Sequence, residues 1–168
     1  MKFKLINFLL FQAGWFVLIL GAAETKTSGA IVISAIIIAI HLLMTPNKIP
    51  EIRLFIYAII IGFIFDGLLQ YYSLILYNDP GWSYPLTPLW IIMLWLMFAM
   101  TLNHSLSWLK GRMLLSIIIG SIGGPMAYIA GEKLGAITII NNQTLFFLAF
   151  GWALATPLLV YLSEKKYG

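Results

Sequence analysis

One carboxylic acid, Asp66, lies inside a long apolar stretch and is the first group in this sequence that could do chemistry. It is the only charged residue between positions 54 and 78. An ionisable group in mid-membrane costs about 2.5 to 3.5 kcal/mol on insertion scales, so it marks either a functional or a structural role. We expect Asp66 to be protonated or bonded to neutral donors. It either binds a proton or ligand, or ties two helices together.

Polar and small residues share the helix face that carries Asp66. Their intervals of three and four residues place them in one stripe facing protein, formed by Gly62, Asp66, Gln70, Ser73 and Tyr77. On the fifth predicted helix, residues 121–125 lie at the same depth, and a stripe continues from there toward the outer side through Ser121, Gly124, Tyr128 and Glu132. Pro125 cannot donate a helical hydrogen bond, so that helix is either broken there or kinked and tightly packed. We predict that Asp66, Gln70, Gly124 and Tyr128 bind a ligand.

Two histidines form a second candidate cluster. His41 precedes Lys48 by seven residues and His104 precedes Lys110 by six, so both lie about 10 Å deep and can face each other. Gln12 lies near the same level. Such histidines relay protons, bind a headgroup, share a metal, or simply bond between helices. Because no third ligand has recognisable spacing, we predict no metal and no other cofactor. His104 and Asp66 are the candidate catalytic acid or base.

Several tryptophans are also predicted inside the bilayer. Trp15, Trp95 and Trp152 fall away from the usual interfacial belts. Trp90 shares a face of the fourth predicted helix with Met97, Thr101, His104 and Trp108. Buried indoles pack helices together, but they also line sites for flat or acyl-chain ligands. The predicted ligand-binding residues are therefore Gln12, Trp15, His41, Asp66, Gln70, Trp90, Trp95, His104, Gly124, Tyr128 and Trp152.

The elements that position these side chains are membrane-spanning helices. Of 168 residues, 61% are hydrophobic and 10% charged, with no cysteine. Six stretches each approach or exceed the roughly 20 residues that cross a bilayer. We predict an all-α polytopic membrane protein with a single domain over residues 1–168, its spans at about 5–23, 29–46, 54–77, 88–108, 113–131 and 144–162. This excludes a soluble enzyme, a disulfide scaffold, a thiolate metal site and, despite the net charge of +4, a nucleic-acid binder.

Charge sets the predicted topology. Eight of the ten cations lie at the termini and in the connections after spans 2 and 4, which predicts that both termini are cytoplasmic. The alternative, a cleaved secretory signal ending near residues 21–23, would spoil this asymmetry. The segment 79–88, rich in proline and aromatic residues, is either an ordered cap over the outer mouth or an interfacial belt.

Short segments spread over the whole chain carry a family resemblance. They are residues 11–15, Gly62 with Asp66 and Gly67, 88–90, 94–95, 98–105, 123–131, 134–136 and 151–153. In this order and spacing the chain resembles a family of uncharacterised six-span bacterial inner-membrane proteins, domain of unknown function 2878. The resemblance implies the bacterial inner membrane but no catalytic residue. Members often accompany genes for membrane fatty-acid modification of the cyclopropane-synthase type, which implies a lipid-related role and a lipid-modifying enzyme as partner.

The leading functional hypothesis is a membrane protein that binds or handles a lipid or other amphiphile in a polar pocket inside the bundle. An enzyme acting on such a molecule is a special case, and whether the chain is an enzyme stays open. The alternative is a small-molecule transporter, either a proton-coupled carrier or a substrate-binding membrane subunit of an uptake system. A third hypothesis is a structural partner for another membrane enzyme. Membrane lipids are expected partners in each case, and nucleic acid is not.

Overall fold

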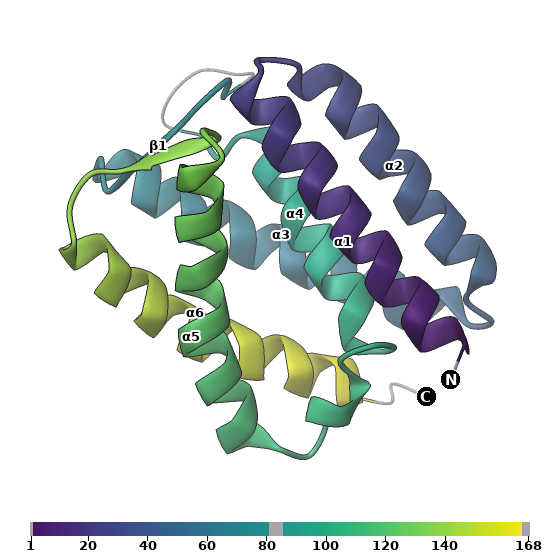
Figure 1. The fold of residues 1–168 in the computed structure, drawn as a ribbon. Coiled ribbons are helices and arrows are strands. Elements are labelled where there is room, and N and C mark those ends of the chain that lie inside the picture. Colours follow the sequence, from purple (N-terminus) through teal and green to yellow (C-terminus); the bar gives the residue numbers. More distant parts are fainter. Residues whose placement is uncertain (1, 81–85, 166–168) are drawn as a thin grey trace.

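The computed structural model describes residues 2–80 and 86–165, and in these residues the chain forms six α-helices (Figure 1). Five are long and apolar enough to cross a membrane, namely α1 (Lys2–Ala23), α2 (Thr27–Met44), α3 (Lys48–Tyr71), α5 (Met113–Lys133) and α6 (Gln143–Glu164). The sixth, α4 (Leu89–Leu102), has 14 residues, or about 21 Å. The predicted all-α membrane fold is confirmed.

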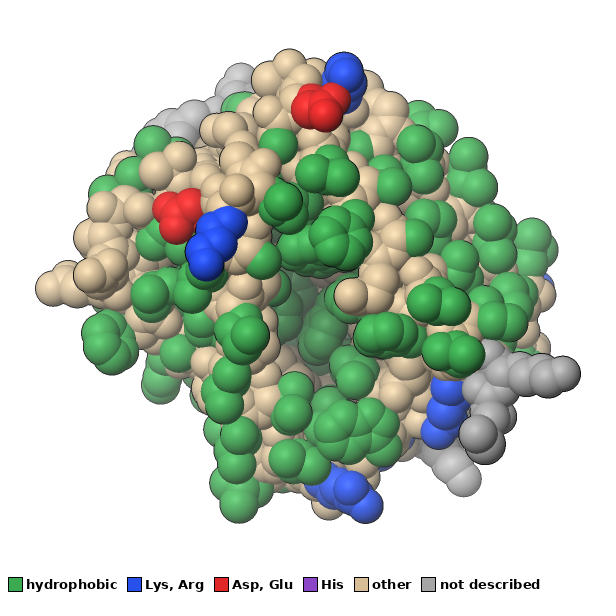
Figure 2. Space-filling view, viewed as in Figure 1, with side chains coloured by type: hydrophobic (Ala, Val, Ile, Leu, Met, Phe, Trp, Pro, Cys, Tyr) green, Lys and Arg blue, Asp and Glu red, His purple; other side chains and the backbone are tan. Residues whose placement is uncertain are grey.

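The outer face of the bundle is apolar, as a lipid-facing surface must be. Figure 2 shows hydrophobic side chains over most of the visible face. On α2, Val32 is 60% exposed and Leu43 is 78% exposed, whereas Ser34 and His41 are fully buried. The β-branched run 31–40 of α2 is helical, because a helix satisfies its own backbone groups where lipid offers no partners.

The short helix α4 forms the centre of the molecule. It packs against α1, α2, α3 and α6, and most of its side chains are buried. Helices α5 and α6 cross as a closely packed pair beside this group (Figure 1). A Cβ atom on Gly120 or Gly124 would overlap Trp152 of α6. Helix α5 continues through Pro125, so the broken-helix interpretation is wrong and tight packing of small residues holds.

A small sheet closes one end of the bundle, which we call the sheet end. Strand β1 (Ile75–Tyr77) pairs antiparallel with β2 (Ile137–Ile139). The helix expected over 54–77 therefore ends earlier, at Tyr71, and Ser73 turns the chain with a φ of +52°. Ser73 and Tyr77 consequently do not continue the helical stripe of Asp66. Residues 81–85, in the predicted cap over the outer mouth, lie outside the described residues.

The opposite end carries Lys4, Lys48, Arg53, Lys110 and Arg112, and we call it the basic end. Here the span expected over 88–108 is shorter than predicted. After Leu102 the chain enters turns and a 3-10 helix, η1 (Ser107–Leu109). Leu106 N–H donates to Thr101 O at 2.8 Å, so the turn satisfies its own backbone. His104 and Trp108 therefore leave the helix face that Trp90 occupies.

Candidate functional site

Asp66 is fully buried and accepts three hydrogen bonds from uncharged groups. Tyr77 and Tyr128 each donate a hydroxyl to Oδ1, at 2.6 and 2.5 Å, and Trp95 Nε1 donates to Oδ2 at 2.6 Å. These donors come from β1, α5 and α4, so one carboxyl on α3 joins four elements. The neutral donors expected from the sequence are confirmed, and the Asp66 carboxyl ties helices together through them.

Glycines allow the indole rings to reach this carboxyl. Gly62 lies one turn before Asp66, and a Cβ there would overlap the Trp95 ring. Trp95 stacks on Trp152 with ring centroids 4.7 Å apart and planes 6° apart. Trp152 in turn lies over Gly124 of α5. A continuous layer from α3 through α4 and α6 to α5 thus holds the Asp66 hydrogen bonds in place.

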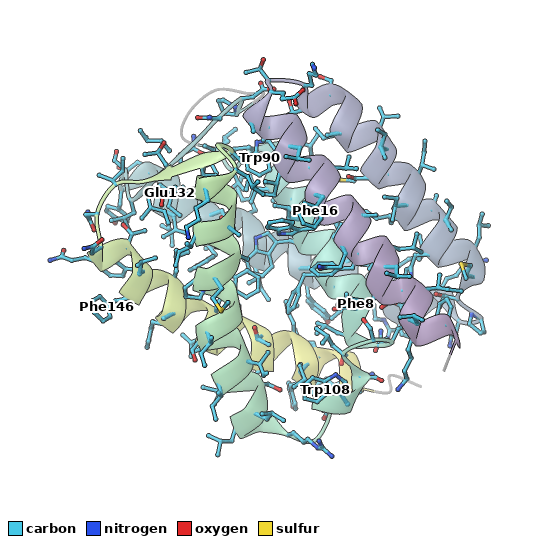
Figure 3. The ribbon with its side chains drawn as sticks, in the orientation of Figure 1. Phe8, Phe16, Trp90, Trp108, Glu132 and Phe146 are labelled. Atoms are coloured by element: carbon cyan, nitrogen blue, oxygen red, sulfur yellow. The ribbon has the colours of Figure 1, made fainter. Side chains whose placement is uncertain are left out.

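Beside this layer lies a cavity of about 370 Å³, lined mainly by aromatic and aliphatic side chains. Figure 2 shows the hollow between α5 and α1, and in Figure 3 Phe16 and Trp90 lie beside it. Seven of the predicted ligand-binding residues line it, namely Gln12, Trp15, Trp90, Trp95, Gly124, Tyr128 and Trp152. We call it the aromatic cavity. Its size and apolar lining are typical of sites for small organic ligands.

Three polar groups of the cavity lining make no hydrogen bond within the described residues. They are Trp90 Nε1, Trp152 Nε1 and Thr156 Oγ1. Trp90 is 1% exposed and Thr156 2% exposed. A buried donor without an acceptor costs about 1 to 3 kcal/mol. These groups lie behind the cavity surface, so the cavity itself presents mainly apolar walls, which suit a ligand with an apolar body.

The aromatic cavity opens sideways between α1 and α5. At the sheet end the two helices approach each other, where Ile19 Cδ1 would lie 3.5 Å from a Cβ on Gly131. Toward the basic end they diverge, as Figure 1 shows. The rim of the hollow in Figure 2 is mostly hydrophobic. The opening thus lies on the apolar side of the bundle.

A second cluster forms at the basic end around Glu51, which sequence reasoning missed. His41 and His104 face each other as expected, with ring centroids 5.0 Å apart. Glu51 bridges them, with Oε2 lying 3.3 Å from His41 Nε2 and Oε1 3.0 Å from His104 Nε2. By sequence Glu51 lies between Pro50 and Arg53 in an apparent polar connection. The structure shows that α3 already begins at Lys48, so Glu51 lies in its first turn, where an acidic residue is favourable.

The predicted residues Gln12 and Gln70 lie outside this cluster. Gln12 lines the aromatic cavity, and Asn7, one and a half turns earlier on α1, bonds to His41 instead. Gln70 is 5% exposed, and its Oε1 has no partner among the described residues.

His41, Glu51 and His104 offer one ligand atom each within 4.8 Å of one another, a composition that suits a divalent metal ion. The sequence predicted no such trio, because its third member was not recognised.

A cleft of about 780 Å³ opens beside the His104 end of this cluster. We call it the basic cleft. It is lined by residues from the α2–α3 connection and the start of α3, from the turn after α4, and from the end of α6. Its charged lining residues are Arg53, Lys110, Lys165, Glu51 and Glu164. Cations therefore outnumber anions at the mouth.

Residues 4–158 match the model of the family described as "Protein of unknown function (DUF2878)". The chain belongs to this family. The match spans both the aromatic cavity and the cluster around Glu51, so both lie inside the family domain. No curated protein and no solved structure matches the chain. The function of this DUF2878 protein has to be argued from its own side chains.

Proposed function

We propose that this DUF2878 protein binds a lipid or other amphiphile in the aromatic cavity. The observation that carries the proposal is a cavity of about 370 Å³ with mainly aromatic and aliphatic walls, in a bundle whose outer face is apolar. An acyl chain would pack along the indoles that line this cavity. The sideways opening between α1 and α5 supports entry from the bilayer.

The proposal includes an orientation. Eight of ten cations belong by sequence to the termini and connections of the basic end. By the positive-inside rule we infer that this end is cytoplasmic, and the family resemblance supports a bacterial inner membrane as the location. The opening then lies in the half of the bilayer nearer the cytoplasm, where newly made lipids are available.

Binding is favoured over proton-coupled transport by the surroundings of Asp66. Both of its oxygens already accept short hydrogen bonds from fixed protein donors. A carrier that used this carboxyl would have to break three such bonds in every cycle. In a binding protein, Asp66 instead holds Trp95 and Tyr128 in the positions from which they line the cavity.

Two glycine variants test the proposal. A Cβ on Gly123 would meet nothing within 4 Å, although Gly123 lines the cavity. Gly123→Leu should therefore fill the cavity without disturbing its walls. Gly29 also has open space around a Cβ but lies on α2 away from the cavity, so Gly29→Leu is a matched control.

Native mass spectrometry of the purified protein would measure retention of fatty acids and lysophospholipids that differ in chain length. We expect wild type and Gly29→Leu to retain a preferred probe equally, and Gly123→Leu to lose at least about tenfold in affinity, or 1.4 kcal/mol. Equal retention by Gly123→Leu, or no retention by wild type above the level of the empty detergent micelle, would overturn the proposal.

A further inference from the structure

The cluster around Glu51 has one side chain, Asn7, whose orientation is fixed by backbone groups. Asn7 Nδ2 donates to Met100 O at 2.9 Å, and Asn7 Oδ1 accepts from Ser105 N–H at 3.2 Å and from Ser105 Oγ at 2.7 Å. A carbonyl can only accept and an N–H can only donate, so the amide cannot be turned over. The side of Asn7 that faces His41 is therefore a donor.

This donor fixes the tautomer of His41. Asn7 Nδ2 lies 3.3 Å from His41 Nδ1, which must therefore accept. In the neutral ring the proton is then on Nε2, pointing at Glu51 Oε2. Metal-bound histidines show the reverse pattern, with one nitrogen on the metal and the other donating its N–H to an acceptor. Despite its composition, the trio is built as a hydrogen-bonded array and not as a metal site.

The same carboxylate fixes His104. Glu51 Oε1 accepts from His104 Nε2 and from Asn103 Nδ2, both at 3.0 Å. Neutral His104 therefore carries its proton on Nε2 and a lone pair on Nδ1. Among the described residues, nothing bonds to Nδ1, while the side chain is 13% exposed and lines the basic cleft. The array thus ends in a His104 nitrogen without a partner among the described residues, on a side chain that lines the cleft.

A cation, Lys110, is held in the same hydrogen-bond network as His104. Lys110 Nζ donates to Asn103 Oδ1 at 2.6 Å and to Ser163 O at 3.2 Å, which leaves one of its three protons for a ligand. Asn103 also bonds to Glu51, so Lys110 and His104 are held by the same network. Both carboxylates of the cleft accept hydrogen bonds from the protein, Glu51 from the two histidines and Glu164 Oε1 from Gly111 N–H at 2.6 Å. An anion entering the cleft meets the remaining Lys110 proton and two further cations of the lining, Arg53 and Lys165, beside these carboxylates.

We propose that the basic cleft is a second binding site, which takes a phosphate group that still carries a proton. Lys110 binds the phosphate oxygens, and His104 Nδ1 accepts the hydrogen bond from the P–OH group. Inorganic phosphate and a terminal phosphate monoester share this chemistry. The site is independent of the aromatic cavity and of what that cavity binds.

The acceptor determines selectivity. Hydrogen phosphate and sulfate are dianions of similar shape near neutral pH, but only hydrogen phosphate has an O–H to donate. Phosphodiesters, which link most membrane lipids, also lack a phosphate proton. A site made of cations alone would bind all of these by charge. A site that places a histidine lone pair next to a cation should prefer the protonated phosphate, because sulfate leaves the lone pair without a partner.

Isothermal titration calorimetry of the purified protein at about pH 7.5 would test this. The probes are inorganic phosphate and sulfate at equal ionic strength, with phosphatidic acid and phosphatidylcholine in nanodiscs. We expect phosphate to bind at least about tenfold more tightly than sulfate, a difference of 1.4 kcal/mol. His104→Ala and Lys110→Gln should each remove this preference, while Lys26→Gln, at the sheet end, should keep it.

The remaining outcomes distinguish free phosphate from a lipid phosphate as the ligand, and phosphate binding from metal binding. Binding of phosphatidic acid without binding of free phosphate would support the site with a lipid monoester as its ligand. Equal affinity for phosphate and sulfate in wild type, or no binding of any phosphate, would overturn the proposal. Nitrogen-15 spectra of labelled histidine provide a check that needs no variant. Both rings should be protonated on Nε2, and one equivalent of Zn²⁺ that binds through His41 and His104 would also overturn it.

Discussion

Alanine at two neighbouring glycines of α5 should change stability by very different amounts. A Cβ at Gly124 would overlap the Trp152 ring, whereas a Cβ at Gly123 meets nothing within 4 Å. Both substitutions gain up to about 1 kcal/mol because alanine is the better helix former. This gain cancels when the two variants are compared. What remains is the cost of overpacking at Gly124, typically about 1 to 3 kcal/mol.

Reversible unfolding in sodium dodecyl sulfate, followed by tryptophan fluorescence, would measure both free energies of unfolding. We expect Gly123→Ala to be as stable as wild type or more stable, and Gly124→Ala to be less stable than Gly123→Ala by about 1 to 3 kcal/mol. Equal stabilities of the two variants would refute the reasoning, because α5 would then not lie against Trp152. Helix propensity alone cannot separate two adjacent positions in mid-helix.

Three further predictions concern individual side chains. Asp66→Asn should lower the free energy of unfolding by about 1 to 3 kcal/mol, because the new amide N–H₂ meets donors, and Asp66→Ala should cost more; the reverse order in the same assay would contradict the three hydrogen bonds. Trp152→Phe should remove most of the near-ultraviolet circular dichroism of the stacked Trp95–Trp152 pair, whereas Trp108→Phe, at a side chain 43% exposed, should leave it. Burial lowers the pKa of Lys110, against the attraction of Glu51 and Glu164. The folded protein then binds the Lys110 proton less tightly than the unfolded chain does. The free energy of unfolding should therefore rise as the pH increases from the lowered pKa of Lys110 to the ordinary lysine pKa of 10.5. Lys110→Gln should remove the part of this rise that Lys110 causes. An unchanged dependence of the free energy of unfolding on pH in this variant would contradict the prediction.

Hydrophobic run lengths were enough to predict the helices but not their ends. The spans of α1, α2, α5 and α6 follow from apolar stretches bounded by charges, because lipid allows only backbone that satisfies itself. The end of α3 at Tyr71 depends on Ser73 in a left-handed conformation and on pairing of β1 with the distant β2. At the end of α4, Asn7 of the distant α1 donates to Met100 O and accepts from Ser105 N–H. Neither contact leaves a local signal in the sequence.

Some residues of the candidate sites could likewise be predicted from the sequence, and others could not. Asp66 could be found because it is a charge inside an apolar span, and Tyr128 because it continues the helix face of Gly124. Trp95 could be found because a tryptophan in mid-span lies away from the interfacial belts. Tyr77 was expected on the same helix as Asp66, yet it reaches Asp66 from a strand. Glu51 was missed because a charge next to Pro50 at a span boundary is typical of a solvated connection. Only the packing of α3 against the turn after α4 brings it between two histidines.

The most direct test of amphiphile binding is to find which side chains a bound acyl chain touches. The purified protein would be illuminated with a fatty acid that carries a diazirine near its methyl end, and the labelled peptides would be mapped by mass spectrometry. The account predicts labels within residues 11–19, 90–98, 119–131 and 152–156, which line the aromatic cavity, and loss of these labels in Gly123→Leu. Labels confined to the lipid-facing side of α2, at Val32, Ile36 and Leu43, would contradict it.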